Sequence, residues 1–349
     1  MDSQTVIYTD DISSALRRVL APLGDVDIHV VTDTNVASLV MPGLDLPPHS
    51  LITVPAGDMA KNLESLSLIW NSLAAGGATR RSVVVNIGGG MVTDMGGFAA
   101  ATFKRGIRFI NVPTTLLGAV DAAVGGKTGI NLGNLKNEVG AFAPAMTVII
   151  SATPFATLPP LEILSGYAEI VKHSLLSSTA SFHKAVATSP LDLTPADMLE
   201  ILRESVEVKR RIVAEDPTEH GLRKALNLGH TVGHAFESHA MHTTSPIPHG
   251  VAVAHGMMVE LIISHMLTGF PGTELHVYRD FLRRAGYSMP AIDCRQYQAL
   301  MALMAHDKKN PSPDRISFTL LSAPGQPLTD RIVPADTILS ALDIYREML

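Results

Sequence analysis

Residues Ser82-Val-Val-Val-Asn86-Ile-Gly88-Gly89-Gly90-Met-Val-Thr-Asp94 decide the fold of this chain. A run of β-branched residues leads into three glycines, and helical spacing follows them. Glycines let the backbone approach a pyrophosphate closely, and the helix N-terminus adds unpaired N–H groups and the positive end of its dipole. The stretch lacks the G-x-G-x-x-G fingerprint, so a plain tight turn is the alternative interpretation. The order of strand, turn and helix favours a dinucleotide site.

Short β-branched runs alternate with helical patterns on both sides of this turn. The expected strands are Thr5–Tyr8, Asp27–Val31, Leu51–Val54, Ser82–Ile87, Arg108–Val112 and Thr147–Ser151. Ile12–Leu20 and Met59–Leu73 have the apolar spacing of helices. This alternation predicts an α/β domain with a mostly parallel, Rossmann-like sheet that binds ligands at the carboxyl ends of its strands.

Helical periodicity dominates the sequence after Pro154. The expected helices are Glu162–Leu176, Pro195–Val213, Ala225–Ala240, Val251–Leu267, Leu275–Ala285 and Tyr297–Ala305. Only Ile316–Leu321 keeps a strand pattern. We therefore expect a dinucleotide-binding α/β domain over residues 1–152 and a mainly α-helical domain over residues 153–349.

The composition bounds the classes of function. With 349 residues, 46% of them hydrophobic and 17% charged, the chain fits a globular enzyme with a large core. A formal net charge of -6 argues against nucleic-acid or membrane-surface partners, which need a basic face, and leaves small anions possible. The single Cys294 excludes an intramolecular disulfide and suits a reducing cytoplasm. No signal-peptide pattern opens the chain, and charges or histidines interrupt every long apolar stretch, so we expect a cytoplasmic protein.

The strongest sign of chemistry is Asn227-Leu-Gly-His230-Thr-Val-Gly-His234-Ala-Phe-Glu237, followed by Pro248-His249-Gly250. His230 and His234 share a helix face because they lie four residues apart, and a third imidazole follows a short loop. Neutral imidazoles with a carboxylate are the usual ligands of a zinc-like ion, and Glu169 is the obvious carboxylate. A single histidine on an apolar helix is usually a core residue, whereas three so close together favour a site.

Lysine and arginine recur beside flexible glycines, as expected for a bound phosphate or carboxylate. Asp121-Ala-Ala-Val-Gly125-Gly126-Lys127-Thr128 departs from the phosphate-loop pattern, because Ala122 replaces its first glycine. Lys136-Asn137 follows within one short loop, and Lys104-Arg105-Gly106 precedes. For each of these residues, solvated surface charge is an equally good interpretation.

Two further charged groups have ordinary explanations when taken alone. Glu169 and Lys172 fit a surface pair on a helix. The segment His306-Asp307-Lys308-Lys309-Asn310 ends a helix, where the dipole by itself favours cations.

Taken together, these motifs resemble those of the 3-dehydroquinate synthases, in the sugar phosphate cyclase group. The matching segments run from Asp33 to about Asn310 in the family's order. They are Gly88-Gly89-Gly90…Asp94, Arg105-Gly106, Pro113-Thr114-Thr115-Leu116-Leu117, Asp121…Gly125-Gly126-Lys127-Thr128, Lys136-Asn137, Glu169…Lys172, Lys209, Arg223…Asn227…Gly229-His230-Thr231…His234, His249-Gly250 and Asp307-Lys308-Lys309. So many motifs in one order make a chance resemblance negligible.

The resemblance implies an NAD-binding domain over residues 1–152 and a metal- and substrate-binding domain over residues 153–349. It also implies a catalytic zinc, for which cobalt often substitutes, and a phosphorylated sugar-acid substrate. The implied metal ligands are Glu169, His230 and His249. The implied NAD-binding residues are Asp33, Asn35, Asp58, Lys61, Gly88, Gly89, Gly90, Asp94, Thr114, Thr115, Lys127, Lys136 and Thr157. The implied substrate-binding residues are Arg105, Asp121, Lys127, Lys136, Asn137, Lys172, Lys209, Arg223, Asn227, His234 and one or both of Lys308 and Lys309. Catalytic roles are implied for His234, Lys127, Lys172, Asn137 and Arg223.

The implied activity converts 3-deoxy-D-arabino-heptulosonate 7-phosphate to 3-dehydroquinate and phosphate, in the shikimate route to aromatic amino acids. NAD oxidises the hydroxyl at carbon 5, phosphate is eliminated, the ketone is reduced again, and the ring opens and closes by an intramolecular aldol reaction. Because NAD returns to its starting state, the net reaction is that of a phosphorus–oxygen lyase. The resemblance also implies a cytoplasmic homodimer.

Several positions depart from the family pattern. Asp58 stands for a common glutamate, Ala122-Ala123 for a serine pair, Leu135 for a glycine, Ser151 for an aspartate and Val251 for a glutamate. None of these changes removes an implied metal ligand or substrate cation. Ser151 and Val251 bear on the support around the site, which tunes a metal centre more than it defines one.

Three other functions compete with this interpretation. A sister cyclase acting on another sugar phosphate is expected to alter the glycine–lysine loop and the basic pocket, whereas Lys127, Lys136, Asn137 and Arg223 are kept. A metal-dependent alcohol or glycerol dehydrogenase shares the two-domain plan, but its substrate has no phosphate and needs fewer cations. A non-catalytic NAD-binding role is disfavoured because the whole ligand and base set is present.

Overall fold

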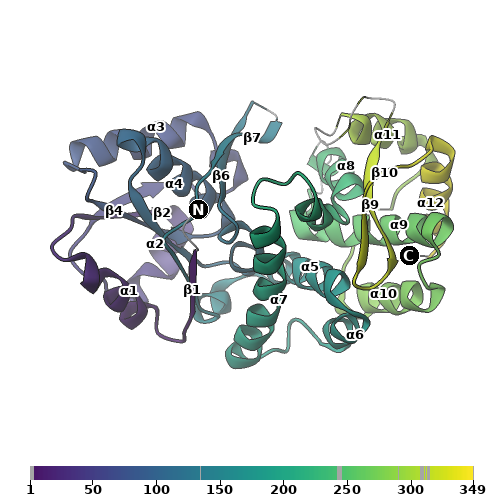
Figure 1. The fold of residues 1–349 in the computed structure, drawn as a ribbon, viewed down its shortest axis with the longest axis horizontal. Helices are drawn as coiled ribbons and strands as arrows, with labels where there is room; N and C mark the ends of the chain where they lie inside the picture. The colour runs from purple at the N-terminus through teal and green to yellow at the C-terminus, as the bar shows by residue number, and fades with distance from the viewer. Residues whose placement is uncertain are drawn as a thin grey trace. The chain divides into compact units, whose positions relative to one another are not determined.

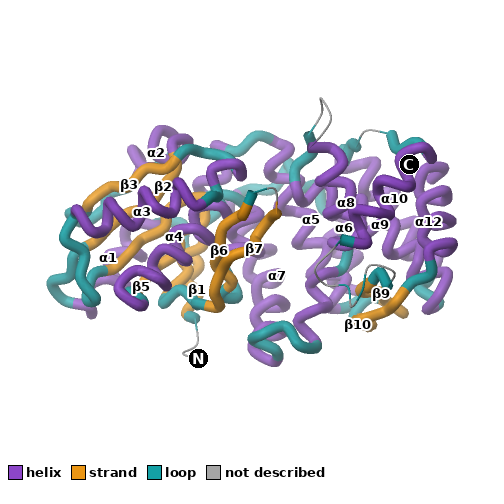
Figure 2. Tube along the Cα trace, turned by 90° about the horizontal axis from the view of Figure 1, so that it is seen from above, coloured by secondary structure: helices purple, strands orange, loops and turns teal. Residues whose placement is uncertain are grey.

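The computed structural model describes residues 4–133, 135–241, 246–289, 291–306, 310, 312 and 315–348. The chain packs into two compact units, residues 1–159 with 194–206 and residues 160–193 with 207–349. Strands are concentrated in the first unit and helices in the second (Figure 2). The expected assignment of NAD to residues 1–152, and of metal and substrate to residues 153–349, stays a prediction.

A six-stranded parallel sheet forms the centre of the first unit, in the order β1-β8-β5-β4-β2-β3 (Figure 1). Its strands are β1 Thr5–Tyr8, β2 Ile28–Asp33, β3 Ser50–Val54, β4 Val83–Gly88, β5 Arg108–Pro113 and β8 Thr147–Ile150. The predicted α/β class with a mostly parallel sheet is confirmed, and each expected strand is present within two residues of its predicted ends.

Helices cover both faces of this sheet. They are α1 Ile12–Leu20, α2 Thr34–Leu39, α3 Leu63–Ala75 and α4 Gly90–Thr102. Alternate residues of a strand point to opposite faces. Val85 of β4 accordingly joins a core with Leu16 of α1. On the other face α4 lies so close that a Cβ on Gly96 would be 2.0 Å from Oδ1 of Asn86.

A hairpin of β6 Lys127–Leu132 and β7 Leu135–Phe142 was not expected from the sequence. Lys127 begins β6, and Lys136 and Asn137 lie in β7, so they do not share one short loop as predicted. The two strands approach closely where a Cβ on Gly129 would lie 2.6 Å from the carbonyl oxygen of Val139. Strands that contain glycines lack the alternation of apolar and polar side chains by which a strand is recognised in a sequence.

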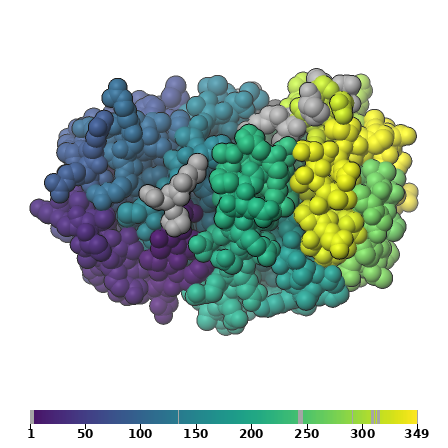
Figure 3. Space-filling model, in the orientation of Figure 1, coloured from purple at the N-terminus to yellow at the C-terminus, as the bar shows by residue number. Residues whose placement is uncertain are grey.

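The second unit is mainly helical, as expected. Its helices are α5 Pro160–Ser177, α6 Thr179–Ala187, the end of α7 Pro195–Glu215, α8 His230–Met241, α9 His249–Thr268, α10 Gly272–Ala285, α11 Tyr297–Ala305 and α12 Ala335–Met348. Strands β9 Ser317–Ala323 and β10 Gln326–Ile332 form an antiparallel hairpin, of which only the first strand was predicted. In Figure 3 the last residues of the chain, coloured yellow, lie at the surface of this unit.

The expected helix Ala225–Ala240 is interrupted just before its first histidine. A short 3₁₀ helix covers Leu222–Asn227, and α8 starts at His230. Gly229 between them has a φ of 82°, a backbone conformation that ends a helix and favours glycine. Because of this interruption, α8 does not continue the preceding 3₁₀ helix.

Helix α9 is the buried centre of the second unit. All of its residues from Gly250 to Ser264 are buried. Length and hydropathy alone would let this helix cross a membrane, but 83% of its apolar window is buried inside the protein. Its apolar character is therefore accounted for by packing.

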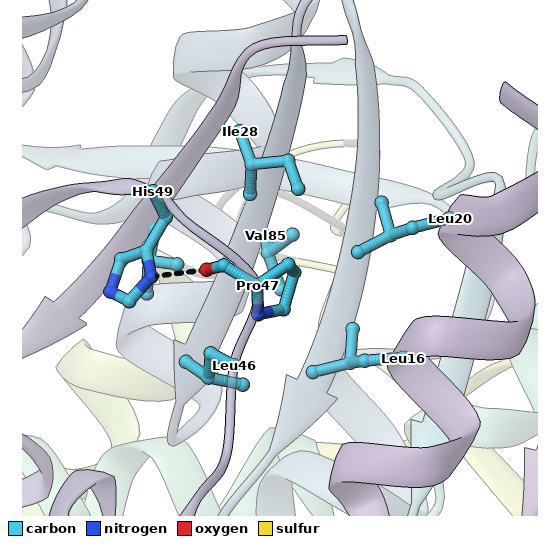
Figure 4. Close-up of a pocket in the computed structure, with 8 residues that line it drawn as sticks. Leu16, Leu20, Ile28, Leu46, Pro47, His49 and Val85 are labelled. Carbon is cyan, nitrogen blue, oxygen red and sulfur yellow. Dashed lines mark hydrogen bonds between the residues drawn. The ribbon is translucent and has the colours of Figure 1, made fainter. Parts of the chain in front are cut away.

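A small apolar cavity lies between α1 and the sheet of the first unit (Figure 4). Leu16, Leu20, Ile28 and Val85 line it, and the ring of His49 contacts the carbonyl oxygen of Pro47 at 2.8 Å at its edge. Its volume of about 10 Å³ holds no more than one water molecule. This cavity belongs to the core and is too small for a substrate.

Candidate functional site

The glycine turn of the first unit leaves little room for side chains. Strand β4 ends at Gly88, and a Cβ there would lie 2.5 Å from the side chain of Val92. Gly89 precedes α4 and provides no side-chain cap. The first N–H groups of α4 therefore have neither a helical carbonyl nor a side chain of Gly89 to bind, which is the arrangement that binds phosphate oxygens.

Polar residues surround this turn at the carboxyl ends of the strands. Thr114 follows β5, donates its N–H to the carbonyl oxygen of Gly88 at 2.9 Å and has a buried hydroxyl with no partner among the described residues. Asp33 ends β2, and its Oδ1 accepts the N–H groups of Asn35 and Val36 at 2.9 and 3.0 Å. An unpaired buried hydroxyl beside free N–H groups fits a polar ligand such as a dinucleotide.

A cluster of charged residues links the β6–β7 hairpin to α4. Lys61 is buried, its ammonium lies 2.6 Å from Oδ2 of Asp94, and it also donates to Oδ1 of Asn137. Lys136 pairs with Asp58 at 3.2 Å. The structure thus brings together five residues for which the resemblance implies contacts with NAD or substrate. Each lysine in the cluster has a carboxylate beside it.

The remaining expected residues of the first unit lie on separate turns. Arg105 is exposed and has a φ of 69°, in the turn that follows α4. Asp121 is half-buried in the turn Gly118–Ala122, and Lys127 is exposed at the start of β6. The hydroxyl of Thr157 donates to the carbonyl oxygen of Pro154 at 2.8 Å.

Three imidazoles converge in the second unit. His230 and His234 lie on α8, and His249 is the first residue of α9. The ring centroids are 5.2 Å apart for His230 and His234, 5.4 Å for His230 and His249, and 5.7 Å for His234 and His249. One nitrogen from each ring lies within 4.8 Å of the other two. The spacing predicted from the sequence therefore does place these side chains at one point.

Glu169 completes this cluster from α5. Its side chain is fully buried, and Oε1 lies 3.7 Å from Nε2 of His230. Oε2 forms an ion pair with Lys172, which is itself only 1% exposed. Neither carboxylate oxygen has a hydrogen bond of good geometry among the described residues, despite the close ammonium. The two residues are thus a buried pair, and the alternative of a surface pair is wrong.

Close backbone packing holds the three helices that carry these side chains. Gly250, next to His249, donates its N–H to Oγ of Ser165 on α5 at 3.0 Å. A Cβ on Gly250 would lie 1.8 Å from the carbonyl oxygen of Ser165. Only glycine permits this approach, so the separation of α5 and α9 is fixed by the backbone.

A buried carboxylate joins α8 to α9. Glu260 of α9 is fully buried, and its two oxygens accept the N–H groups of Gly229 at 2.6 Å and Val232 at 3.2 Å. These donors lie at the N-terminus of α8, where no intrahelical carbonyl is available. Glu260 therefore caps the helix that carries His230 and His234.

The expected basic residues of the second unit lie on α7 and on the loop before α8. Lys209 is buried on α7, and Arg223 is buried and donates to the carbonyl oxygen of Pro217 at 2.6 Å. Asn227 donates to Oε1 of Glu219 at 3.2 Å. Lys308 and Lys309 lie outside the described residues.

Asp216 organises this loop. Its carboxylate accepts the N–H groups of Gly221 at 2.7 Å, His220 at 3.0 Å and Arg223 at 3.0 Å. Desolvation is the largest single influence and raises the pKa of Asp216, but these N–H groups together outweigh it and lower the pKa to about 2. The carboxylate is thus charged at neutral pH and fixes the backbone that presents Arg223.

Sequence reasoning assigned no role to Glu237, Glu260, Asp216 or Glu219. Glu237 lies seven residues after His230, and helical spacing alone would have placed it on the same face. Glu260 gives no such signal, because its partners lie 31 and 28 residues away in the chain.

The donor set of the second unit fits a divalent metal ion. Imidazole nitrogens and a carboxylate oxygen are the ligands that zinc and cobalt prefer. The buried oxygens of Glu169 accept no hydrogen bond from the described residues, and a bound ion would satisfy them. The expected ligand set of Glu169, His230 and His249 lies together, and His234 lies within the same cluster.

Comparisons with known proteins agree with this arrangement. The 3-dehydroquinate synthase N-terminal family model matches residues 51–165, and the C-terminal model matches residues 166–310. A 3-dehydroquinate synthase of Parabacteroides distasonis is 46% identical over 351 residues, which cover 99% of each chain. The chain belongs to the 3-dehydroquinate synthase family. A family relative of that name from Bartonella tribocorum is 35% identical, over 97% of this chain and 94% of its own.

Solved structures of related cyclases share the fold over nearly the whole chain. A 2-deoxy-scyllo-inosose synthase complexed with carbaglucose-6-phosphate, NAD+ and Co2+ is 26% identical with a TM-score of 0.87, over 99% of this chain and 96% of that one. A 2-epi-5-epi-valiolone synthase of Streptomyces hygroscopicus with NAD+ and Zn2+ bound is 25% identical with a TM-score of 0.85, over 99% and 98%. A probable glycerol dehydrogenase of Sinorhizobium meliloti, 14% identical with a TM-score of 0.68 over 99% and 96%, shares the fold alone.

Two of the departures from the family pattern, Val251 and Ser151, lie at buried positions. Val251, beside His249, is fully buried. Ser151 is buried after β8, and its hydroxyl donates to Oγ1 of Thr153 at 3.2 Å. Neither side chain leaves an unpaired buried polar group among the residues that the structure describes.

Proposed function

We infer that this chain is a 3-dehydroquinate synthase, which converts 3-deoxy-D-arabino-heptulosonate 7-phosphate to 3-dehydroquinate and phosphate. The observation that carries this inference is membership of the family over the full length together with the intact cluster of Glu169, His230, His234 and His249. The enzyme is a lyase of the shikimate route to aromatic amino acids.

The enzyme depends on NAD and a divalent metal ion. Bound NAD takes up and returns a hydride, and a divalent ion lowers the pKa of a hydroxyl that it binds. We assign Glu169, His230 and His249 as the residues that hold the ion. The buried oxygens of Glu169, which have no hydrogen bond among the described residues, support this assignment.

We assign the NAD site to the glycine turn Gly88–Gly90 and the polar groups around it. Thr114, Thr115 and Asp94 lie at or next to the turn, whereas Asp33 and Asn35 lie at the end of β2. The remaining proposed contacts are Asp58, Lys61, Lys127, Lys136 and Thr157. The unpaired hydroxyl of Thr114 supports this assignment.

The basic residues of both units are proposed to bind the phosphate and carboxylate of the substrate. Guanidinium and ammonium groups bind such anions and stabilise the charge of a leaving phosphate. In the second unit Lys172, Lys209 and Arg223 are all buried, so little water weakens the field of these charges. His234 has an imidazole beside the proposed metal ligands, and we assign it to hold or move a proton of a substrate hydroxyl.

The remaining proposed substrate contacts are Arg105, Asp121, Lys127, Lys136, Asn137, Asn227, Lys308 and Lys309. Of these, Lys127 and Asn137 are proposed to be catalytic, together with Lys172, Arg223 and His234. We further propose that the protein works as a cytoplasmic homodimer without nucleic-acid or membrane partners. The net charge of -6 supports the absence of those two partners.

The decisive experiment supplies purified protein with the heptulosonate phosphate, catalytic NAD and zinc. We expect phosphate and dehydroquinate in equal amounts, no net NADH, and loss of turnover on chelation. Stoichiometric NADH would indicate a dehydrogenase. Absence of turnover, followed by activity on another polyol phosphate, would indicate a sister cyclase.

A pair of histidine variants tests the proposed cluster. His230→Ala removes a proposed metal ligand and is expected to reduce kcat/KM by ~100-fold or more. His183→Ala is the matched control, because its side chain is 51% exposed and pairs with Glu274 at 2.6 Å on other helices. Equal activity of the two variants would contradict the assignment.

A further inference from the structure

Glu237 is a buried carboxylate directed at a histidine of the cluster. Its Oε2 lies 3.0 Å from Nδ1 of His249, and the Glu237 side chain is only 7% exposed. The family motifs imply no role for Glu237. The contact joins α8, which carries Glu237, to the first residue of α9.

Helical spacing places Glu237 beside the other two histidines. His230, His234 and Glu237 follow each other at intervals of four and three residues, so they form one stripe along α8. His249 lies across from this stripe, with ring centroids 5.4 and 5.7 Å from those of His230 and His234. One face of α8 thus provides two imidazoles and the carboxylate that holds a third.

The contact determines which nitrogen of His249 carries the proton. A neutral imidazole carries one N–H, and a carboxylate accepts it. When Nδ1 donates to Glu237, Nε2 keeps the lone pair that a metal ion requires. The negative charge also makes the ring a better donor to a cation.

His230 is oriented in the same way by a different acceptor. Its Nδ1 lies 3.2 Å from the carbonyl oxygen of Leu228, and its Nε2 is the nitrogen near Glu169. Both imidazoles proposed to hold the ion therefore have Nδ1 next to an oxygen. At His249 this oxygen belongs to a side chain, so a substitution can remove it.

We propose that Glu237 is a positioning residue that fixes the orientation and the protonated nitrogen of His249 for metal binding. This inference rests on the proposed function, because it requires the proposed metal site. Glu237 acts through His249 and is assigned no contact with the substrate.

The experiment measures zinc affinity of the full-length protein by competition with a chromophoric chelator, after the metal has been stripped. Glu237→Ala is expected to weaken zinc binding by ~10–100-fold. Glu237→Gln keeps an acceptor without the charge, and its affinity is expected to lie between those of Glu237→Ala and the wild type. With cobalt loaded, the visible absorption bands are expected to shift in Glu237→Ala.

Ser264→Ala provides the matched control. Ser264 is buried on the same helix as His249, and its hydroxyl donates to the carbonyl oxygen of Glu260 and accepts the N–H of Leu321. Its loss weakens packing of α9 without touching the cluster, so zinc affinity and cobalt bands are expected to match the wild type. If Ser264→Ala lost as much zinc affinity as Glu237→Ala, the loss would reflect general destabilisation, and the proposal would be overturned.

The outcomes separate this inference from the proposed function. A wild-type protein that binds no zinc contradicts the proposed metal site itself. A wild type that binds zinc and a Glu237→Ala variant with the same affinity overturn only the role of Glu237. If Glu237→Ala does not fold, Glu237→Leu decides, because it keeps most of the side-chain volume and has no acceptor. Wild-type zinc affinity in that variant overturns the proposal.

Discussion

Glu169 and Lys172 are the residues at which burial changes the interpretation most. A carboxylate and an ammonium three residues apart fit an exposed helix surface equally well. In the structure both side chains are essentially inaccessible, at 0% and 1% exposure. Removing one member of such a pair leaves a buried charge without compensation.

Lys172→Met is therefore expected to lower the free energy of unfolding by about 3–5 kcal/mol when zinc has been chelated. Excess zinc is expected to recover part of this loss, because an ion beside Glu169 compensates the same charge. Chemical denaturation with and without chelator measures both values.

Lys224→Met is the control for this variant. Lys224 pairs with Asp330 at 2.8 Å, and the two side chains are 34% and 56% exposed. Exposed pairs contribute little, so we expect a change of less than about 1 kcal/mol that does not depend on zinc. Similar losses in the two variants would show that the Glu169 pair is solvated.

His255 is a buried histidine outside the cluster, and it predicts a pH dependence of stability. Desolvation lowers its pKa from 6.5 to about 4, and Nδ1 lies 2.9 Å from the hydroxyl of Tyr345. The unfolded state therefore binds more protons than the folded state between these two values. The contribution of His255 to stability is therefore greatest above pH 6.5 and falls as the pH decreases toward 4.

His255→Gln removes this titration. Between pH 8 and pH 5 we expect the free energy of unfolding to fall by about 2 kcal/mol more in the wild type than in the variant. The reason is that one pKa unit corresponds to about 1.4 kcal/mol. Urea unfolding at the two pH values provides the comparison. Parallel pH profiles in wild type and variant would rule out a neutral buried His255.

At the scale of elements, the site depends on how closely α5, α8 and α9 approach. Glu260 bridges α8 and α9, and Gly250 sets the contact of α9 with α5. Because His249 precedes Gly250 directly, any widening of this contact displaces an imidazole of the cluster.

Gly250→Ala is expected to destabilise the protein by about 3 kcal/mol and to weaken zinc binding. The added Cβ would lie 1.8 Å from a backbone oxygen, which cannot move aside as a flexible side chain would. Thermal unfolding and zinc competition measure the two effects.

Gly272→Ala is the matched control, since a Cβ at this helical position meets His265 at an ordinary 3.5 Å. We expect its stability to be unchanged or raised by up to about 1 kcal/mol, as alanine favours a helix more than glycine does. If Gly250→Ala behaved like Gly272→Ala, the close approach of α5 and α9 would be wrong.

At the scale of the whole molecule, the two compact units provide different chemistry. The first presents the glycine turn and the second presents the cluster of imidazoles and Glu169. A ligand that binds only the folded state stabilises the unit that carries its site.

Zinc at a concentration 100 times its dissociation constant is expected to raise the free energy of unfolding of the second unit by about 2.7 kcal/mol. Calorimetry with zinc and then with excess chelator tests this, and His230→Ala is expected to lose the increment. An equal zinc effect in that variant would place the ion elsewhere.

Much of the fold was predictable because its signals are local. Each strand of the parallel sheet was located by its β-branched run, and Thr5–Tyr8, Ile12–Leu20 and Tyr297–Ala305 have their predicted bounds. The β6–β7 hairpin was missed because its glycines interrupt the alternation of side chains. The start of α8 was misplaced because a positive φ at Gly229 ends the preceding turn.

The sequence by itself determined the α/β class, the family and the convergence of His230, His234 and His249, because helical spacing and ordered motifs are properties of the chain. Only the tertiary structure decided that Glu169 and Lys172 are buried, that Glu260 caps α8 and that Glu237 holds His249. Solvent exclusion and contacts between distant segments depend on how helices pack, and no local pattern encodes them. The supporting carboxylates therefore became evident only once α5, α8 and α9 were assembled.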